Sequence, residues 1–121
     1  MPFSKETVGG YLSFNCYSHE EGSNYAYVVA PVNDSTIKTG DFAVVLDHST
    51  GRYVTAVVAD RGHDYNEVSL KVAWDLGYSA SGLYGPAGDF ETIYFPNTRI
   101  NWLGSIEGYF DALDYFVSQY Y

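Results

Sequence analysis

The sequence predicts one mainly β domain with two helices, a β-rich α+β fold that spans residues 1–121. Short apolar runs rich in β-branched and aromatic residues come first, and Gly, Asn, Asp and Pro turn signals separate them. Apolar spacings of three and four residues appear in two later segments, which indicates helices there. With 121 residues, of which 46% are hydrophobic, the chain can bury one modest core.

The strands are expected mostly in the first half of the chain. Weak alternation predicts one strand within residues 11–17, and an apolar run predicts another over residues 25–30, closed by Pro31. Residues 42–46 and 52–58 flank a glycine-containing turn and therefore predict a hairpin. Both of its strands are almost continuously apolar, as expected of strands that are buried on both faces.

Two helices are expected after these strands. One apolar stripe predicts a helix over residues 67–76, with Gly77 placed to end it; the stripe consists of Val68, Val72, Ala73 and Leu76. A Gly/Ser-rich loop over residues 79–88 and a strand over residues 91–95 are expected next. A second stripe predicts an amphipathic helix over residues 106–119, and it consists of Ile106, Phe110, Leu113 and Val117.

The net charge of −9, from 6 Lys+Arg against 15 Asp+Glu, argues against nucleic-acid binding, which depends on clustered cations. It favours a cationic ligand or a basic partner, although acidic surfaces also serve solubility. A single cysteine, Cys16, rules out an internal disulfide and a cysteine-based zinc site, and no metal or cofactor is expected. Neither a signal peptide nor an apolar run near the roughly 20 residues of a membrane span is evident. We therefore expect a soluble protein without membrane contact, either secreted as a trimmed chain or cytoplasmic or virion-associated.

The most informative segment is residues 59–69, where Asp60 and Glu67 are expected at the two ends of one strand-to-helix connection. Such a connection can hold acid and base groups over a groove. On pattern alone a structural alternative is favoured, in which Asp64 is the N-cap and Glu67 reaches back to its amide. A calcium loop is rejected, because Lys71 occupies the position that requires a bidentate carboxylate. Ser69 is expected only to face the helix end.

Several short strings in this chain resemble strings of a known family and occur in the same order. They are residues 27–31 (YVVAP, family YVVLP), 40–45 (GDFAVV, family GDxAVV), 58–62 (VADRG, family VGDxG), 67–77 (family GEGSIxLAxxLG), 92–96 (TIYFP, family YIVFP) and the helix within 106–116. Over roughly residues 25–118 the chain thus resembles the fungal and bacterial chitosanases of glycoside hydrolase family seventy-five, as a shortened variant. Ala59 and Val68 replace family glycines, and the loop between the two carboxylates is shorter.

The resemblance implies a small double-psi-like β-barrel with a groove across its face. It also implies inverting hydrolysis of β-1,4 bonds in chitosan or a related amino-sugar polymer, with Glu67 as general acid and Asp60 as base or as the group that stabilises the cationic transition state. Inversion requires the two carboxyl groups to stand roughly 6.5–9.5 Å apart. Glu67, beside Val68 and Tyr65, is expected to be partly desolvated, which raises the pKa of a carboxyl group. Asp60, beside Arg61, is expected to stay ionised.

The residues expected to bind substrate are Arg61, Asp64, Tyr65, Tyr53 and Tyr84. Aromatic residues make up 18% of the chain, mostly as 13 tyrosines, which suits stacking on sugars but also ordinary sheet propensity. Two other functions stay open: an inactive barrel used as a binding or structural module, for example on a virus particle, and an acidic protein that binds a basic partner. Self-association or a larger assembly would use the Tyr-rich C-terminus, which comprises Tyr109, Tyr115, Tyr120 and Tyr121.

Overall fold

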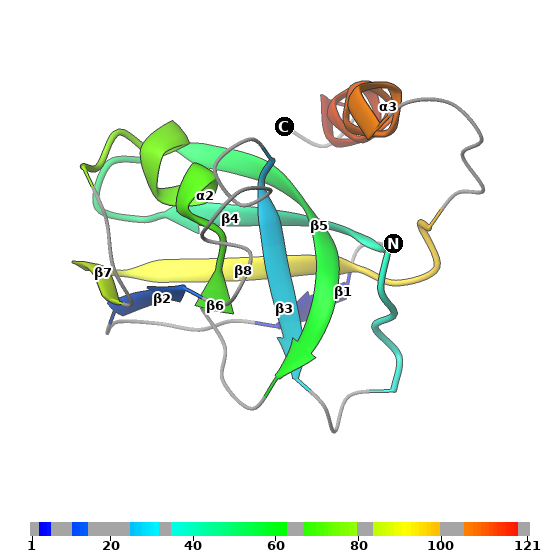
Figure 1. Cartoon of the computed structure of the whole chain (residues 1–121), viewed down its shortest axis with the longest axis horizontal. Coiled ribbons are helices and arrows are strands. Elements are labelled where there is room, and N and C mark those ends of the chain that lie inside the picture. The colour runs from blue at the N-terminus through cyan, green and yellow to red at the C-terminus, as the bar shows by residue number, and fades with distance from the viewer. Residues whose placement is uncertain are drawn as a thin grey trace.

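The computed structural model describes residues 3–5, 11–14, 25–31, 35–62, 67–79, 84–99 and 106–118. It confirms a small, mainly β domain with two short helices (Figure 1). The strands are β1 (Phe3–Lys5), β2 (Tyr11–Phe14), β3 (Tyr27–Pro31), β4 (Phe42–Asp47), β5 (Tyr53–Gly62), β6 (Glu67–Val68), β7 (Tyr84–Ala87) and β8 (Phe90–Phe95); the helices are α2 (Leu70–Asp75) and α3 (Ile106–Ser118).

The strands form one mixed sheet of eight in the order β1-β8-β4-β5-β3-β6-β2-β7. The pairs β3–β5 and β2–β6 are parallel, whereas the other neighbours are antiparallel. Within the described strands, β1 and β7 are the two edges and do not pair with each other, so the expected barrel closure is absent there. Both edge strands are short, and Pro86 in β7 has no N–H to offer a further strand.

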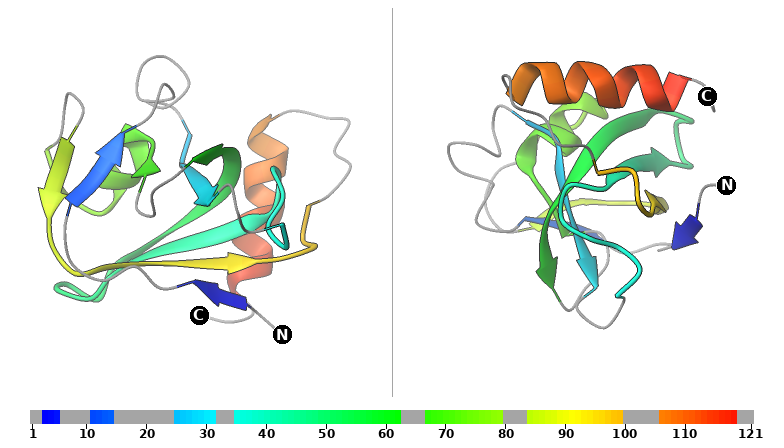
Figure 2. Two further views of the ribbon diagram at one scale, coloured as in Figure 1. Left: turned by 90° about the horizontal axis from the view of Figure 1, so that it is seen from below. Right: turned by 90° about the vertical axis from the view of Figure 1, so that its right-hand side faces the viewer.

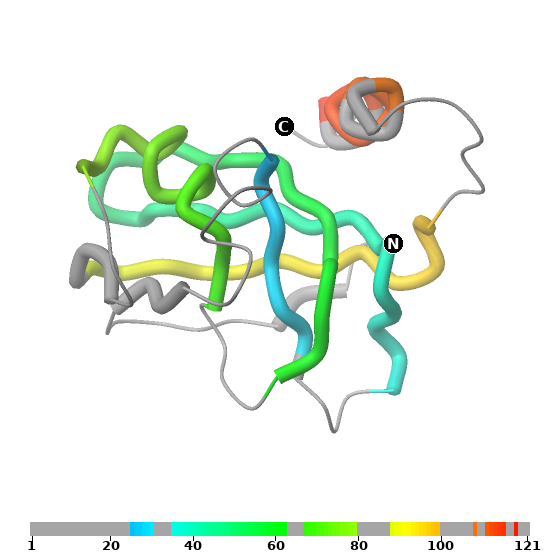
Figure 3. Tube along the Cα trace, in the orientation of Figure 1, coloured from blue at the N-terminus to red at the C-terminus, as the bar shows by residue number. Residues whose placement is uncertain are grey.

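The hairpin expected around residues 42–58 is confirmed, with Phe42 opposite Val57 and Leu46 opposite Tyr53. β5 extends further than expected, through Gly62, and it curves strongly along its length (Figure 3). The extension follows from parallel pairing with β3, which comes from a distant part of the chain. Residues 59–62 therefore belong to a strand and not to a connecting loop.

A buried carboxylate holds the turn of this hairpin. The Asp47 side chain accepts hydrogen bonds from the Ser49 amide at 3.0 Å and from the Thr50 hydroxyl at 3.1 Å. It also accepts one from the Tyr78 hydroxyl, which lies beyond α2. Gly51 has φ 76°, a conformation that favours glycine, and its amide donates to the Asp47 carbonyl at 2.8 Å. Asp47 therefore ties the hairpin turn to the end of α2.

The Tyr78–Asp47 bond should make stability depend on alkaline pH. The hydrogen bond to Asp47, together with burial, raises the pKa of Tyr78 above its ordinary value of 10.0. Because the folded-state pKa is the higher one, this bond contributes its full stability below pH 10.0 and loses it as pH rises through the folded-state pKa. We expect the wild-type advantage over Tyr78→Phe in unfolding free energy to shrink between about pH 9 and 11. Urea unfolding at both pH values measures this, and a constant difference would contradict it.

The apolar side chains form two clusters on the two faces of the sheet. The larger cluster includes all the buried apolar residues of α2, and its members are Ala26, Val28, Ala30, Ile37, Ala43, Val45, Val54, Ala56, Val58, Val68, Leu70, Val72, Ala73, Leu76, Phe90 and Tyr94. The smaller cluster lies where α3 packs against β5 (Figure 2), and its members are Tyr27, Phe42, Val44, Val57, Phe95 and Leu113. Residues of β3 and β4 alternate between the two clusters, as a strand covered on both faces requires.

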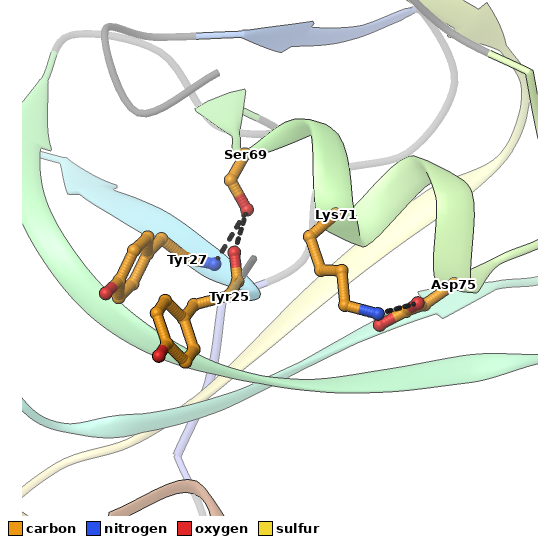
Figure 4. A network of polar contacts seen from close by, with 5 residues as sticks. All are labelled: Tyr25, Tyr27, Ser69, Lys71 and Asp75. Carbon is orange, nitrogen blue, oxygen red and sulfur yellow. Dashed lines mark hydrogen bonds and ion pairs between the residues drawn. The ribbon is translucent and has the colours of Figure 1, made fainter. Parts of the chain in front are cut away.

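The helix expected over residues 67–76 begins later, at Leu70, with Ser69 as its N-cap residue. The fully buried Ser69 hydroxyl does not cap the helix; it donates to the Tyr25 carbonyl at 2.8 Å and accepts from the Tyr27 amide at 2.9 Å (Figure 4). These bonds hold the chain against β3 just before α2, so Glu67 and Val68 form β6 instead of a first helical turn.

The capping-box alternative was therefore wrong, since Ser69 and not the earlier Asp64 precedes the helix; Asp64 itself lies outside the described residues. The helix ends where expected, because Leu76 caps it and Gly77 follows with φ 97°. Residues 84–87 form β7, where a loop was expected, and β1 was not predicted. The C-terminal helix is confirmed over Ile106–Ser118. No helix among the described residues has both the length and the apolar character needed to cross a membrane.

Candidate functional site

A bulge near the end of β5 determines where Asp60 points. Val28 pairs with Val58, but the next residue of β3, Val29, pairs with Asp60, so β5 carries one extra residue, Ala59, at this point. A β-bulge of this kind re-aims the side chains that follow it. Without it, Ala59 would stand opposite Val29. The exposed Asp60 carboxylate is then fixed locally, since its Oδ1 accepts a hydrogen bond from the Arg61 amide at 2.8 Å.

Glu67 lies on the other side of β3. Val28 pairs antiparallel with Val68, and one residue further along this register Val29 stands opposite Glu67. A Cβ atom added to Gly62 would lie 2.8 Å from Val29 Cγ1 and 3.1 Å from Glu67 Oε2. The partly buried Glu67 side chain therefore reaches along the sheet face toward the end of β5, and Gly62 leaves the space that its carboxylate occupies.

These pairings continue across two more strands. Glu67 pairs with Ser13 of β2, and Ser13 pairs with Tyr84 of β7. Five residues on five adjacent strands thus occupy one transverse line, called here the cross-strand row: Asp60, Val29, Glu67, Ser13 and Tyr84. Directly paired residues of neighbouring strands share a face of the sheet. Three of the residues singled out from the sequence, Asp60, Glu67 and Tyr84, therefore belong to the same row.

The row sets the separation of the two acids. One strand, β3, lies between the strands of Asp60 and Glu67, so their backbones are two strand spacings apart, about 9.5 Å. Carboxyl groups that lean toward each other from that separation can fall within the roughly 6.5–9.5 Å that an inverting glycosidase requires. Between them lies Val29, which is 2% exposed, so its side chain is covered and presents no open surface.

Other residues predicted for the site lie elsewhere. Arg61 pairs with Ala30 on the face of the larger apolar cluster, and its guanidinium donates to the Ile37 carbonyl. Strand alternation thus turns Arg61 away from the face of Asp60, although the two are adjacent in sequence. Asp64 and Tyr65 lie outside the described residues. The row therefore presents two acidic residues while the nearest arginine in sequence faces the other way.

Tyr53 lies in a different place, at the start of β5, whereas Asp60 is near its end. It is 43% exposed and lines a cleft of about 370 Å³ between β5, α2 and α3, called here the β5–α3 cleft, whose residues are Tyr53, Val54, Thr55, Asp75, Asp114 and Ser118. Asp75 pairs with Lys71 at 2.7 Å, and Asp114 accepts a hydrogen bond from Thr55. The cleft therefore combines an aromatic ring with two carboxylates.

Sequence reasoning did not single out Asp75 and Asp114. The Lys71–Asp75 pair has the four-residue spacing of a helical ion pair and could have been recognised as such (Figure 4). Their convergence on Tyr53 depends on how two helices far apart in the chain pack against β5, and no local signal encodes that. Among the described residues, no three His, Cys, Asp or Glu side chains gather in a way that could hold a metal ion.

Comparison with known protein families finds none that matches this chain, and comparison with curated proteins finds no significant match. The resemblance to chitosanases therefore stays a prediction that rests on the short strings of residues 27–116.

Proposed function

We propose that the protein hydrolyses β-1,4 bonds in chitosan or a related amino-sugar polymer, with Glu67 as general acid and Asp60 as general base. The observation that carries the proposal is the cross-strand row. It gives two acidic residues on one face of a rigid sheet, about two strand spacings apart, which leaves room for a water molecule between base and sugar.

The surroundings of the two acids suit different roles. Glu67 is partly buried, and its carboxylate lies next to the space beside Gly62 that Val29 also borders, so it is partly shielded from water. Asp60 is exposed, so a water molecule can reach its carboxylate, as a general base requires.

The net charge supports this class of substrate. A chain of net charge −9 attracts a polycation, and Arg61 is turned to the opposite face from the two acids. The finer fold that goes with the proposal is a double-psi-like barrel, although the described edge strands β1 and β7 do not pair with each other. Parallel pairing of β3 with β5, which are not consecutive strands, supports it, because such pairing needs a crossover connection and not a hairpin.

The test is release of reducing ends from partly acetylated chitosan between about pH 4 and 8, with NMR detection of the first anomer formed. We expect turnover with inversion in the wild type and a rate at least tenfold lower in Asp60→Asn. Asp89→Asn is the matched control. Asp89 is also an exposed aspartate, but it directly precedes β8 beside the hairpin turn, at the opposite end of β5 from Asp60. Retention of configuration, or equal loss in both variants, would contradict the proposed pair.

A second candidate is a non-catalytic module that binds a basic partner. Tyr115 of α3 favours it, because its side chain is 73% exposed, and the exposed Asp111 and Asp114 lie on the same helix. Tyr109, Tyr120 and Tyr121 give no further support, since their side chains are outside the described ones. In this case the same assay would show no turnover, and chitosan oligomers would bind the folded protein in a salt-dependent manner.

A further inference from the structure

The cationic side chains of this acidic chain differ in whether they have a bonding partner. Of its 6 Lys+Arg residues, three are engaged: Arg52 with the Leu76 carbonyl at 3.4 Å, Arg61 with the Ile37 carbonyl, and Lys71 with Asp75 at 2.7 Å. The Lys5 side chain is outside the described ones. The remaining two, Lys38 and Arg99, are exposed, and their charged groups meet no hydrogen-bond or ion-pair partner in the described part of the chain.

Lys38 and Arg99 border the same pocket, although they are far apart in sequence. The pocket has a volume of about 400 Å³, and its other lining residues are Asp41 and Asn97. This is at the lower end of the range for small-molecule sites, roughly 300–1,000 Å³. Asn97 has φ 61°, a left-handed conformation that asparagine tolerates, and it turns the chain directly after β8.

A buried carboxylate builds this pocket. Asp41 is 0% exposed; its Oδ2 accepts from the Lys38 amide at 2.9 Å, and its Oδ1 accepts from the Thr98 and Arg99 amides at 3.2 and 3.1 Å. The Phe42 amide adds a bond to Thr98 Oγ1 at 2.8 Å. Asp41 thus binds the backbone of both cationic residues and holds them on either side of the pocket. Its oxygens are directed toward amides, which offsets part of its negative charge.

The charge balance selects the ligand chemistry. Two cationic side chains and one carboxylate leave a formal charge of +1 at the pocket, in a chain whose net charge is −9. A monoanion matches this balance better than a dianion, which would meet the negative field of the protein without full compensation. The planar guanidinium of an arginine fits the two oxygens of a carboxylate, and a lysine ammonium adds a second charge.

We propose that the pocket formed by Lys38, Asp41, Asn97 and Arg99 binds the carboxylate group of a small acidic ligand, either a free acid or the acid group of a sugar. Arg99 pairs with the carboxylate, Lys38 supplies the second positive charge, and the Asn97 amide can donate to a neighbouring oxygen. This site is separate from the cross-strand row and does not depend on the function proposed for that row.

NMR titration of the folded ¹⁵N-labelled chain, at constant ionic strength, tests the proposal. Sodium glucuronate is the probe, glucose is the neutral match, and acetate and phosphate are the two other anions. We expect saturable shifts of the amides of residues 38–41 and 97–99 with glucuronate at a Kd on the order of 1 mM, weaker binding of phosphate, and no saturable shift with glucose. If acetate binds as tightly as glucuronate, a free acid is sufficient for binding. If acetate binds more weakly, the ligand is an acidic sugar.

Three single variants complete the test. Arg99→Gln and Lys38→Gln should each weaken glucuronate binding at least fivefold, while Lys71→Gln, which removes a lysine that pairs with Asp75 on α2, should leave it unchanged. All three side chains are at the surface, and unchanged spectra away from the pocket will show that each variant is folded. The proposal is overturned by shifts that stay linear with concentration, by phosphate binding more tightly than carboxylate, or by equal weakening in Lys71→Gln.

Discussion

Replacing Glu67 with glutamine is expected to lower kcat for chitosan hydrolysis by roughly a thousandfold, because general acid catalysis contributes typically 10²–10⁴-fold. Glutamine keeps the size of the side chain and its capacity for hydrogen bonding, but its amide has no acidic proton to transfer to the leaving oxygen. The measurement is the initial rate of reducing-end release, with thermal unfolding followed by circular dichroism in parallel. Full activity in Glu67→Gln would exclude this residue as the acid.

The form of the loss separates a catalytic role from a structural one. Glu67 lies beside Gly62 and Val29, so a variant that merely disturbed this contact would weaken substrate binding and lower the unfolding free energy. Loss of a proton donor lowers kcat with KM nearly unchanged. It also removes the limb of the pH–rate profile that belongs to the acid. A raised KM with an unchanged pH profile would therefore assign Glu67 to structure and not to catalysis.

Local signals were sufficient for the elements that depend on neighbouring residues. The hairpin of β4 and β5 follows from two apolar runs around a glycine turn, and α3 follows from one apolar stripe. Local signals were insufficient where a distant strand determines the conformation of a segment. Glu67 and Val68 fit a helical stripe, yet bonds from Ser69 to Tyr25 and Tyr27 hold them in β6. The same limit explains why β7, rich in glycine and proline, was expected as a loop.

The candidate site also combines features that neighbouring residues predict with features that depend on distant strands. Asp60 and Glu67 were expected together because they flank one short connection, and the structure does place them in one row. The reason is different: β3 inserts between their strands, and a bulge at Ala59 brings Asp60 into register. Arg61 was expected beside Asp60, but strand alternation separates them. Tyr53 and the missed Asp75 meet in the β5–α3 cleft through packing of helices, which no spacing in the sequence reports.

Asp41 shows how one buried side chain can connect segments that sequence patterns treat separately. Its carboxylate joins the turn before β4 to the turn after β8, through three backbone amides. Backbone donors near the core that lose their acceptor cost about 1–3 kcal/mol each unless water replaces it. Two of the three donors belong to residues with exposed side chains, so water will replace part of the loss.

We therefore expect Asp41→Ala to lower the unfolding free energy by about 2–4 kcal/mol and Asp41→Asn by about half as much. The asparagine can keep one oxygen facing Thr98 and Arg99, but its NH₂ group then faces the Lys38 amide, where two donors oppose each other. Urea unfolding followed by circular dichroism gives both values, and Asp89→Ala is the control for loss of an exposed aspartate. An alanine variant within about 0.5 kcal/mol of the wild type would show that water satisfies these amides, because changes of that size are typical of surface substitutions. The two cationic residues of the pocket would then be positioned by their own turns and not by Asp41.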